Sequence, residues 1–402
     1  MYNKIICISG KNRIAIECHR YLLTNFPTIK TIACINMTDV GKNDSQPSYS
    51  LFCKQNGIPI YLLEDCYSIN NLIFFSLEFD RLIKTEKFNT QELFNIHFSL
   101  LPKYKGMYTS ALPILHGESE SGVTLHCINN GIDTGDIIDQ KRFDISIQDN
   151  AEDLYNKYIE SGIELFKSNF ENILNMNFNA IPQSPLNSSY FSKAQIDYGN
   201  DIRILLNTTA FQLHNQLRAF NFRRYQLPVV YGYQIHRSEI LNVRCTGKPG
   251  HIEFEDDVKL TLNTIDYFID LYKDKLDEII LAAKVGDVFS LKLYASFRYR
   301  LNEKNQFGWD ILIVSSFNEQ IEVVEYILKN NICPVDSTNY KGTTALMYAM
   351  TSACKSNRTD VLELLLSYGA DMKLRDERGK NIIDYAKEYN NSTILQYLTK
   401  LL

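Results

Sequence analysis

The sequence has little of what several protein classes require. Its 402 residues carry 42 Lys and Arg against 47 Asp and Glu, a net charge of −5, whereas chains that grip nucleic acid usually have a basic surplus. No apolar run approaches the roughly 20 residues that span a bilayer. The apolar stretch at the start is too short for a secretion signal, and no small-residue cleavage site follows it. These absences predict a cytoplasmic protein that binds neither nucleic acid nor membrane.

Cysteine motifs and phosphate-binding motifs are also missing. The nine cysteines are scattered and show neither C-x-x-C spacing nor a Cys/His cluster, so neither a zinc site nor a disulfide framework is predicted. We expect buried, reduced thiols and no metal. The patterns G-x-G-x-x-G and G-x-x-x-x-G-K-[ST] are absent, which argues against a dinucleotide-binding or P-loop protein.

The chain is long and apolar enough for two or three domains, with 45% hydrophobic and 12% aromatic residues. In residues 1–185, short apolar runs alternate with helical patterns, which predicts an α/β domain with a Rossmann-like, mostly parallel sheet covered on both faces. The expected strands are Lys4–Ser9, Thr31–Ile35, Ile58–Leu62, Leu72–Leu77, Leu93–Phe98 and Gly122–Ile128, and the expected helices are Asn12–Leu23 and Ser48–Gln55.

A candidate anion site follows the first expected strand. Gly10 makes the turn into a helix, whose free N–H groups and dipole attract negative charge. Lys11, Asn12 and Arg13 add two cations and an amide there. The same residues also suit an ordinary strand-to-helix turn with solvated basic side chains.

The centre of the chain carries the clearest chemical signal. Residues 94–106 read FNIHFSLLPKYKG and residues 122–138 read GVTLHCINNGIDTGDII. Asn95 and His97 are two apart on a strand and so share a face, and Asp133 lies in a glycine-flanked loop that can return to the same place. A histidine base, an amide donor for an oxyanion and a carboxylate beside the imidazole suit acyl transfer.

These two stretches resemble the folate-dependent formyltransferases. The positions that match the family pattern are Asn95, His97, Ser99, Leu100, Leu101, Pro102, Gly106, Gly122, Thr124, His126, Asp133 and Gly135. The resemblance covers about the first 230 residues. It implies a catalytic trio of Asn95, His97 and Asp133 and the formyl donor N10-formyltetrahydrofolate, with no metal. We expect His116 and His126 to be core or loop histidines.

The resemblance also places the donor and the acceptor. Spacing puts folate beside two loops, which contain Leu77, Glu78, Phe79, Asp80 and Arg81 in one case and Asn129, Asn130, Gly131 and Ile132 in the other. The form GMYTSALPILHGE after the first motif is similar to the sugar-nucleotide formyltransferases. The sugar nucleotide is then expected at Gly10, Lys11, Asn12, Arg13, Lys103, Tyr104, Met107, Tyr108, Phe220 and Tyr225.

The family pattern alone leaves three possible acceptors of the formyl group: glycinamide ribonucleotide, methionyl-tRNA and a sugar nucleotide. A glycinamide ribonucleotide enzyme leaves the second half of the chain unexplained, and a tRNA enzyme is expected to carry a basic C-terminal domain, which this chain lacks. The resemblance therefore implies a dTDP-linked amino-dideoxyhexose, with dTDP-3-amino-3,6-dideoxy-D-glucose favoured, in bacterial O-antigen and lipopolysaccharide synthesis. A 4-amino or UDP-linked sugar stays open, and so does an ankyrin interaction scaffold with a degenerate enzyme domain.

Residues 186–272 are expected to form a small α+β lobe that borders the acceptor site and, as the resemblance implies, helps to build a homodimer. Asp201–Phe220 has helical spacing, and the segments around Pro228, around Gly232 and within 251–262 read as strands. The aromatic residues of this lobe either cover the substrate or fill its core; they are Phe220, Phe222 and Tyr225.

Residues 273–402 read as an all-α ankyrin domain. Gly308, Gly342 and Gly379 recur at spacings of 34 and 37 residues, against an ankyrin period of roughly 33. Four inserted residues within TSACKSNR explain the longer spacing, and about three and a half units are expected from about Lys275. The single tryptophan, Trp309, occupies the variable position after a repeat glycine. We expect it at the surface, as part of an auxiliary site for a second nucleotide sugar or a protein partner, although a merely stabilising module is an alternative.

Overall fold

The computed structural model describes residues 4–198 and 202–401. They form two compact units, which we treat separately. The N-terminal unit comprises the residues up to Lys42 together with Ser48–Asp274, and the repeat unit comprises Asn43–Pro47 and Lys275–Leu402. The finer division at residues 185 and 272 stays a prediction.

A seven-stranded sheet forms the centre of the N-terminal unit, in the order β3-β2-β1-β4-β5-β7-β8. Its strands are β1 (Ile5–Gly10), β2 (Lys30–Ile35), β3 (Ile60–Tyr61), β4 (Leu72–Leu77), β5 (Leu93–His97), β7 (Glu120–Cys127) and β8 (Ile137–Asp144). The first five strands of this order pair in parallel, and β7 and β8 are antiparallel. The predicted mostly parallel sheet is therefore confirmed, although the strand expected at Ile58–Leu62 is only two residues long.

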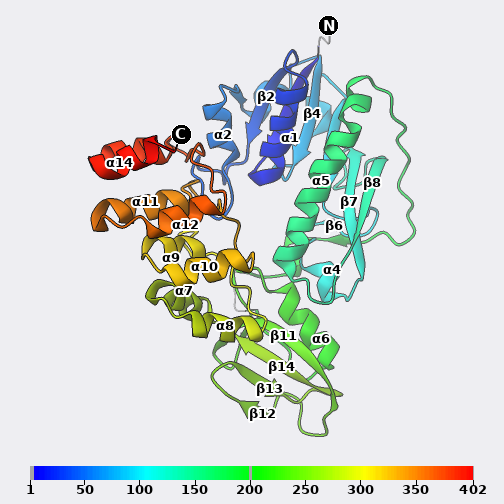
Figure 1. The fold of residues 1–402 in the computed structure, drawn as a ribbon. Helices are drawn as coiled ribbons and strands as arrows, with labels where there is room; N and C mark the ends of the chain where they lie inside the picture. Colours follow the sequence, from blue (N-terminus) through cyan, green and yellow to red (C-terminus); the bar gives the residue numbers. More distant parts are fainter. Residues whose placement is uncertain (1–3, 199–201, 402) are drawn as a thin grey trace. The chain divides into compact units, whose positions relative to one another are not determined.

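Alternation along each strand builds a core on both faces of this sheet. On β1, Ile6 and Ile8 face one core while Cys7 faces the other. Three helices cover the first face, namely α1 (Asn12–Asn25), α2 (Tyr49–Gln55) and α5 (Ala151–Leu174). Figure 1 shows α1 and α5 side by side on the sheet. The short α3 (Leu63–Cys66) and the 3-10 turn Thr85–Lys87 lie toward the second face.

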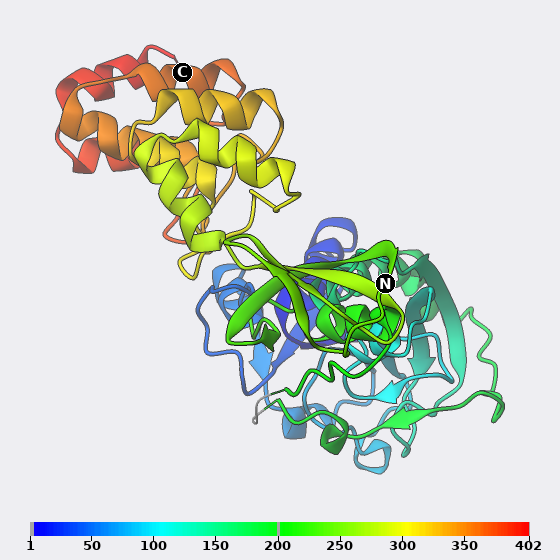
Figure 2. The same ribbon diagram turned by 90° about the horizontal axis from the view of Figure 1, so that it is seen from below.

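The end of the N-terminal unit carries an antiparallel sheet in the order β10-β11-β14-β13-β12 (Figure 2). The elements of this lobe are α6 (Ala210–Ala219), β10 (Val229–Val230), β11 (Tyr233–Arg244), β12 (Ile252–Glu255), β13 (Lys259–Leu262) and β14 (Tyr267–Lys273). The remaining short elements are β6 (Lys105–Gly106), α4 (Leu112–Leu115), β9 (Tyr190–Phe191) and the 3-10 turn Lys193–Gln195.

The helix predicted at Asp201–Phe220 is wrong in its first half. Asp201 lies outside the described residues, and residues 202–209 are not helical. Thr209 starts the helix instead, because its hydroxyl accepts a hydrogen bond from the Gln212 N–H in a capping box. Two buried side chains then attach α6 to the loop before α5. His214 bonds to the Ile147 carbonyl (2.8 Å), and Arg218 donates to the Ser146 carbonyl (3.0 Å).

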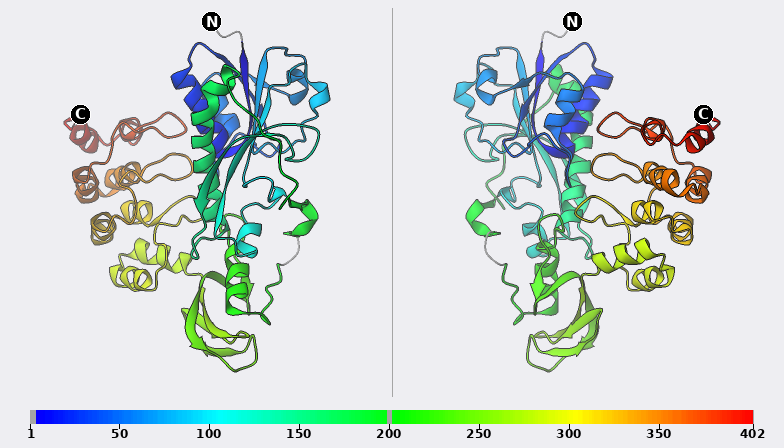
Figure 3. Two further views of the ribbon diagram at one scale, coloured as in Figure 1. Left: turned by 90° about the vertical axis from the view of Figure 1, so that its right-hand side faces the viewer. Right: turned by 90° about the vertical axis from the view of Figure 1, so that its left-hand side faces the viewer.

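The repeat unit consists of four stacked helix pairs (Figure 3). The helices are α7 (Leu276–Val285), α8 (Val288–Ser296), α9 (Ile311–Phe317), α10 (Ile321–Lys329), α11 (Ala345–Ser356), α12 (Asp360–Ser367), α13 (Ile382–Glu388) and α14 (Ser392–Thr399). The expectation of three and a half units is wrong, because α8 completes the first pair. Gly286 at φ 86° ends α7 and the Asp287 side chain caps α8.

The predicted insertion lengthens one helix. The first helix of the third pair, α11, has 12 residues, whereas its counterparts α9 and α13 have seven each. Asn357 ends α11 in the left-handed conformation at φ 60°. Among the described residues of both units, we find no helix with the length and hydropathy needed to traverse a bilayer.

Candidate active site

The three residues that are predicted to be catalytic meet at the end of β5. Asn95 and His97 project from the same face of this strand, and its antiparallel neighbour β7 places His126 opposite Asn95 and Thr124 opposite His97. Asp133 comes from the loop that connects β7 and β8. The structure therefore brings the three predicted residues together from two separate segments.

His97 is held between a carbonyl and a carboxylate. Its Nε2 lies 2.8 Å from the Tyr104 carbonyl oxygen, an acceptor, so Nε2 carries the proton in the neutral ring. Its Nδ1 lies 3.5 Å from Asp133 Oδ2. Because the side chain is only about a tenth exposed, Nδ1 is the ring nitrogen that can exchange a proton within the site, with the carboxylate beside it to stabilise an imidazolium.

His126 makes a contact at this site that the sequence reasoning missed. It is buried, as expected, but its Nε2 lies 3.0 Å from Asn95 Nδ2. Burial lowers the pKa of His126 to about 4, so the ring is neutral at pH 7. Its Nδ1–H donates to the Cys127 carbonyl (2.8 Å), which leaves Nε2 to accept from the Asn95 amide. The antiparallel register that makes this pair is not visible in the sequence.

The hydrogen bond to His126 fixes the orientation of the Asn95 amide, and in this orientation one of the two amide N–H groups has only a weak partner. The Asn95 amide nitrogen carries two N–H groups. One donates to His126, and the other contacts Asp133 Oδ1 at 3.5 Å, which is long for a hydrogen bond. This second N–H is the donor that remains for a ligand.

The Asp133 loop is fixed from several sides. The carboxylate accepts from the Gly106 N–H (2.9 Å), and Gln183 donates to the carbonyls of both Asp133 and Gly135 (2.9 and 2.7 Å). Asp133 itself has φ 53°, a left-handed conformation that is uncommon for a residue with a side chain. Gly135 passes so close to β7 that a Cβ would stand 1.8 Å from the Cys127 carbonyl oxygen.

A second polar cluster lies where β1 and β4 end side by side, the place where the strand order reverses and ligands bind in such sheets. Glu78 Oε2 accepts from the Tyr155 hydroxyl (2.9 Å) and faces Asn12 Nδ2 at 3.4 Å. Burial raises the pKa of Glu78 to about 7, although Lys11 opposes the shift. Glu78 was predicted for folate and Asn12 for the sugar nucleotide, and the structure joins them in one cluster.

The other residues of the predicted folate loops have varied surroundings. Leu77 is fully buried in the core, so only its backbone is open to a ligand. Arg81 forms an ion pair with Glu64. The two loops are linked, because Thr85 donates to the Asn130 side chain (2.6 Å). Next to Asn130, the Asn129 side chain closes a turn by accepting from the Gly131 N–H and the Thr134 hydroxyl, and Ile132 is exposed.

Several residues predicted for the sugar nucleotide have other contacts. Arg13 pairs with Glu160 on α5, and Lys103 lies 3.6 Å from Glu118. Tyr104 is buried, and its hydroxyl donates to Glu118 while its carbonyl accepts from His97.

Met107 and Tyr108, which follow Tyr104 in the sequence, differ in how far their side chains are exposed. Met107 is exposed, whereas the Tyr108 hydroxyl lies 2.9 Å from the carbonyl oxygens of both Lys193 and Ile196, which share its single O–H. Met107 is therefore open to a ligand, while Tyr108 serves to fix the 193–196 segment.

The aromatic residues of the lobe differ in exposure. Phe220 is buried in the main core, which corrects the expectation that it covers a substrate. Phe222 is also buried, with its ring centroid 5.5 Å from that of Tyr155 and 4.9 Å from that of Tyr225. Tyr225 itself is 65% exposed, so it is the member of this group that can cover a ligand beside Glu78.

Trp309 is not the exposed platform that the sequence predicts. It is half-buried, because its ring packs edge-on against Phe317 and Tyr348, with centroid distances of 5.8 and 4.9 Å. It forms part of the wall of a groove of about 390 Å³ in the repeat unit. The side chains that line this groove include Lys341, Lys355, Arg378, Tyr385 and Tyr389.

Comparison with known proteins gives two family matches. The formyl transferase family matches residues 77–168, and ankyrin repeats in three copies match residues 279–376. The structure is similar to that of WlaRD, a sugar 3N-formyltransferase crystallised in the presence of dTDP and 5-N-formyl-THF, with 42% identity and a TM-score of 0.64 over 68% of this chain and 98% of that one. It is also similar to an N-formyltransferase from Helicobacter canadensis in complex with folinic acid and dTDP-3-aminofucose, with 43% identity and a TM-score of 0.63 over 67% and 99%.

Methionyl-tRNA formyltransferases are similar over shorter stretches. The protein from Endomicrobium trichonymphae is 50% identical over 78 residues, which are 19% of this chain and 25% of that protein. The one from Hydrogenobaculum sp. is 30% identical over 172 residues, which are 43% of this chain and 56% of that protein. The chain thus spans about a quarter and about half of the length of these two relatives, whereas it spans nearly all of the two sugar enzymes.

Proposed function

Because the chain belongs to the sugar N-formyltransferase family, we propose that it transfers the formyl group of N10-formyltetrahydrofolate to the amino group of a dTDP-linked 3-amino-3,6-dideoxyhexose. The observation that carries this proposal is the assembly of Asn95, His97 and Asp133 at one strand end. The substrates are supported by the two solved enzymes, one crystallised with dTDP and the other with dTDP-3-aminofucose.

In the proposed reaction, the folate supplies an activated formyl carbon, and the chain's own groups handle the charges. The acceptor amine attacks the formyl carbon, and His97 Nδ1 accepts the proton that this amine loses, while Asp133, 3.5 Å away, stabilises the resulting imidazolium. The bond between the formyl carbon and N10 of the folate then breaks and N10 takes the proton from His97, which leaves the N-formyl sugar and tetrahydrofolate. Asn95 uses the N–H that faces Asp133 at 3.5 Å to donate to the formyl oxygen as that oxygen gains negative charge. The neutral His126 keeps this amide in the donating orientation.

The acceptor is proposed to lie along the β1–β4 edge. The backbone N–H groups at the start of α1 suit the diphosphate, with Lys11 beside them. Glu78, Asn12 and Tyr155 then face the hexose, because a carboxylate, an amide and a phenol together accept from and donate to sugar hydroxyl groups. The exposed Tyr225 covers this cluster from the lobe.

A substrate panel tests the proposal. Purified chain is incubated with N10-formyltetrahydrofolate and one of four amino sugars: the 3-amino-3,6-dideoxy sugar on dTDP in the gluco or the galacto configuration, a dTDP-4-amino sugar, or a UDP-3-amino sugar. We expect the dTDP-3-amino sugars to react fastest, with the gluco form preferred, which would fit a role in O-antigen and lipopolysaccharide synthesis. His97→Asn is expected to bind these sugars without formylating them. Full activity in His97→Asn, or preference for the 4-amino or UDP sugar, contradicts the proposal.

Formylation of methionyl-tRNA is the alternative that the shorter matches raise. The net charge of −5 argues against it, because tRNA binding depends on neutralising phosphates. Adding methionyl-tRNA to the same assay is expected to give no product.

We also propose that the N-terminal unit forms a homodimer through its lobe. Its five-stranded sheet ends in two edge strands, β10 and β12, and Val229 on the apolar β10 is 50% exposed. Exposed apolar edge strands favour pairing with another chain. Sedimentation velocity of the full chain is expected to show a dimer, and a monomer at micromolar concentration would refute this assembly.

The groove beside Trp309 supports a second candidate function, an auxiliary nucleotide-sugar site in the repeat unit. The indole edge and three tyrosines offer stacking surface for a base. Three cations and two carboxylates also line the groove, which leaves a net positive charge for a diphosphate; they are Lys341, Lys355, Arg378, Asp376 and Glu377. Calorimetry is expected to show two dTDP-sugar sites per chain, and only one in Trp309→Ala. The matched control Phe307→Ala, which removes an exposed ring from the same unit, should keep both. An unchanged stoichiometry in Trp309→Ala would refute the site.

A further inference from the structure

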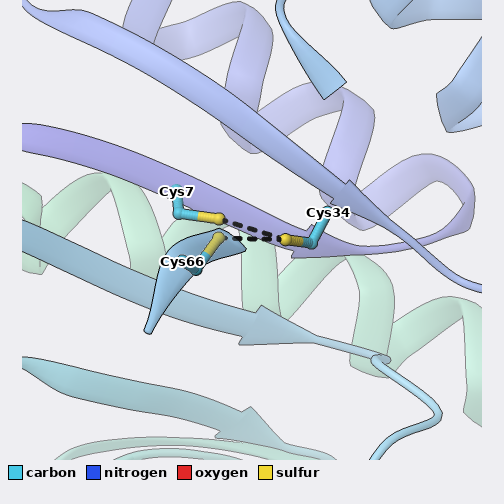
Figure 4. Close-up of side chains that lie close together, drawn as sticks. All are labelled: Cys7, Cys34 and Cys66. Carbon is cyan, nitrogen blue, oxygen red and sulfur yellow. Dashed lines mark hydrogen bonds between the residues drawn. The ribbon is translucent and has the colours of Figure 1, made fainter. Parts of the chain in front are cut away.

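Three cysteines that are far apart in the sequence meet in the core on the second face of the main sheet. Cys7 lies on β1, Cys34 on β2, and Cys66 is the last residue of α3. All three are buried, and Figure 4 shows their sulfur atoms pointing toward one another. The Sγ atoms of Cys7 and Cys34 are 3.8 Å apart, those of Cys34 and Cys66 are 3.4 Å apart, and all three lie within 4.8 Å of one another.

We propose that Cys7, Cys34 and Cys66 form a binding site for a soft metal ion, and that monovalent copper is the ion that fits it. The sulfur triangle has the right size. Metal–sulfur bonds of about 2.3 Å in a trigonal arrangement place the sulfurs roughly 4 Å apart, close to the observed separations. A disulfide requires about 2.05 Å, so the three cysteines are free thiols.

The surroundings favour an ion that needs only three ligands. Within the described residues, the group of His, Cys, Asp and Glu side chains that can share one ion contains only these three cysteines. The hydrophobic side chains of this core include Ile32, Leu63, Leu72, Phe74, Phe88 and Leu93. Zn²⁺ takes a fourth ligand and Mg²⁺ or Ca²⁺ takes oxygen ligands, whereas thiolates select Cu(I).

Binding releases protons, because the thiolate is the form of cysteine that binds a metal. A Cu⁺ ion held by two thiolates and one thiol displaces two thiol protons to solvent and leaves a net charge of −1 on the cluster.

We place the entry of the ion at α3. This helix has only four residues, and Glu64 and Asp65 on it are exposed while Cys66, next in sequence, is buried. A local opening of so short a helix brings the Cys66 sulfur to the surface without disrupting the sheet. A buried metal site needs such a path.

Copper titration of the reduced, full-length chain tests the site. Cu(I) is supplied anaerobically in competition with bicinchoninate, and X-ray absorption counts the sulfur ligands. We expect one Cu(I) per chain with three sulfur ligands, and an affinity about 100-fold lower in Cys34→Ala. The matched control Cys53→Ala removes an equally buried thiol from the opposite core and should bind copper as the natural chain does.

A second measurement covers the case in which Cys34→Ala does not fold. The natural chain is alkylated in mild denaturant with and without Cu(I), and each cysteine is followed by mass spectrometry. Selective protection of Cys7, Cys34 and Cys66 but not Cys53 supports the site. Equal protection of all cysteines, equal affinity in Cys34→Ala and the natural chain, or tighter binding of Zn²⁺ than of Cu(I) overturns it.

Discussion

Replacing Glu78 by glutamine is expected to stabilise the N-terminal unit at pH 8 and to have little effect at pH 4. Burial raises the pKa of Glu78 to about 7 from an ordinary value of 4.5. The folded chain therefore holds this proton more tightly than the unfolded chain does. The contribution of protonated Glu78 to the free energy of unfolding is fully present below pH 4.5 and is lost as the pH rises from 4.5 to 7. Above that range the free energy of unfolding no longer changes through this group. Glutamine is neutral throughout and escapes the loss.

The expected difference follows from the same two values. A displacement from 4.5 to about 7 corresponds to about 3 kcal/mol, and most of it is reached by pH 8. Glutamine keeps an oxygen that accepts from the Tyr155 hydroxyl, whose bond to Glu78 is 2.9 Å long. The substitution thus removes the charge without removing this contact, and the net gain in the free energy of unfolding at pH 8 should be about 2 to 3 kcal/mol.

Urea unfolding read by hydrogen exchange of peptides from β1 and β4 measures this difference. These peptides are needed because the only tryptophan, Trp309, reports on the repeat unit. Each variant is compared with the natural chain at the same pH, so intrinsic exchange rates cancel. Glu160→Gln is the control, because Glu160 is exposed and pairs only at the surface with Arg13. A difference for Glu78→Gln that does not change between pH 4 and pH 8 would refute the reasoning.

Three further predictions concern other parts of the chain. His126→Ala removes the acceptor that orients the Asn95 amide, so kcat should fall about tenfold or more with KM nearly unchanged, and His126→Gln should restore part of it in steady-state assays. Gly135→Ala places a Cβ against the Cys127 carbonyl, so activity and the melting temperature should both fall, and a chain with normal kinetics would show that the loop can shift. Asn357→Ala puts an ordinary side chain in the left-handed conformation and should lower the stability of the repeat unit by about 1 kcal/mol, whereas Asn357→Gly should not, as Trp309 fluorescence in urea will show.

The sequence predicted the main sheet well because its strands are buried on both faces. A continuous apolar run of six residues such as Leu72–Leu77 is short for a buried helix and suits a strand that is buried on both faces, and the structure gives that strand the same bounds. Where a local cap overrides hydrophobic spacing, the prediction failed. Residues 202–209 share apolar spacing with α6, but the Thr209 side chain begins the helix after them.

The sequence predicted those parts of the candidate site that depend on spacing or on a motif, and it did not predict contacts that depend on how separate strands pair. The spacing of Asn95 and His97 puts both on one strand face, and the motif supplies Asp133. His126 could not be assigned, because its contact with Asn95 depends on the register of β5 against β7. The cysteine cluster was hidden for the same reason, since two strands and a helix must pack before its sulfurs meet.

Repeat periodicity has a similar limit. The glycine spacing located the insertion in α11, because an excess of four residues between fixed landmarks can be counted. It did not reveal α8, whose start depends on a left-handed glycine and an aspartate cap and not on the period. The period also does not reveal how far Trp309 is buried. Its closer ring partner, Tyr348, belongs to the next repeat, so this contact forms only when the repeats stack.

Part of the backbone strain of the chain lies where the proposed substrates meet. Asn12, Glu78, Tyr104 and Asp133 are all left-handed residues with side chains, at φ 53–58°, a conformation that costs roughly 1–2 kcal/mol each. Each of these residues directs a polar group into the site. The Asn12 and Glu78 side chains face one another. The Tyr104 carbonyl accepts from His97, and the Asp133 carboxylate faces the same imidazole. Strain of this kind persists only where the surrounding structure fixes it. The geometry around His97 is therefore set by the backbone at the strand ends, which explains how these groups stay in register before any substrate binds.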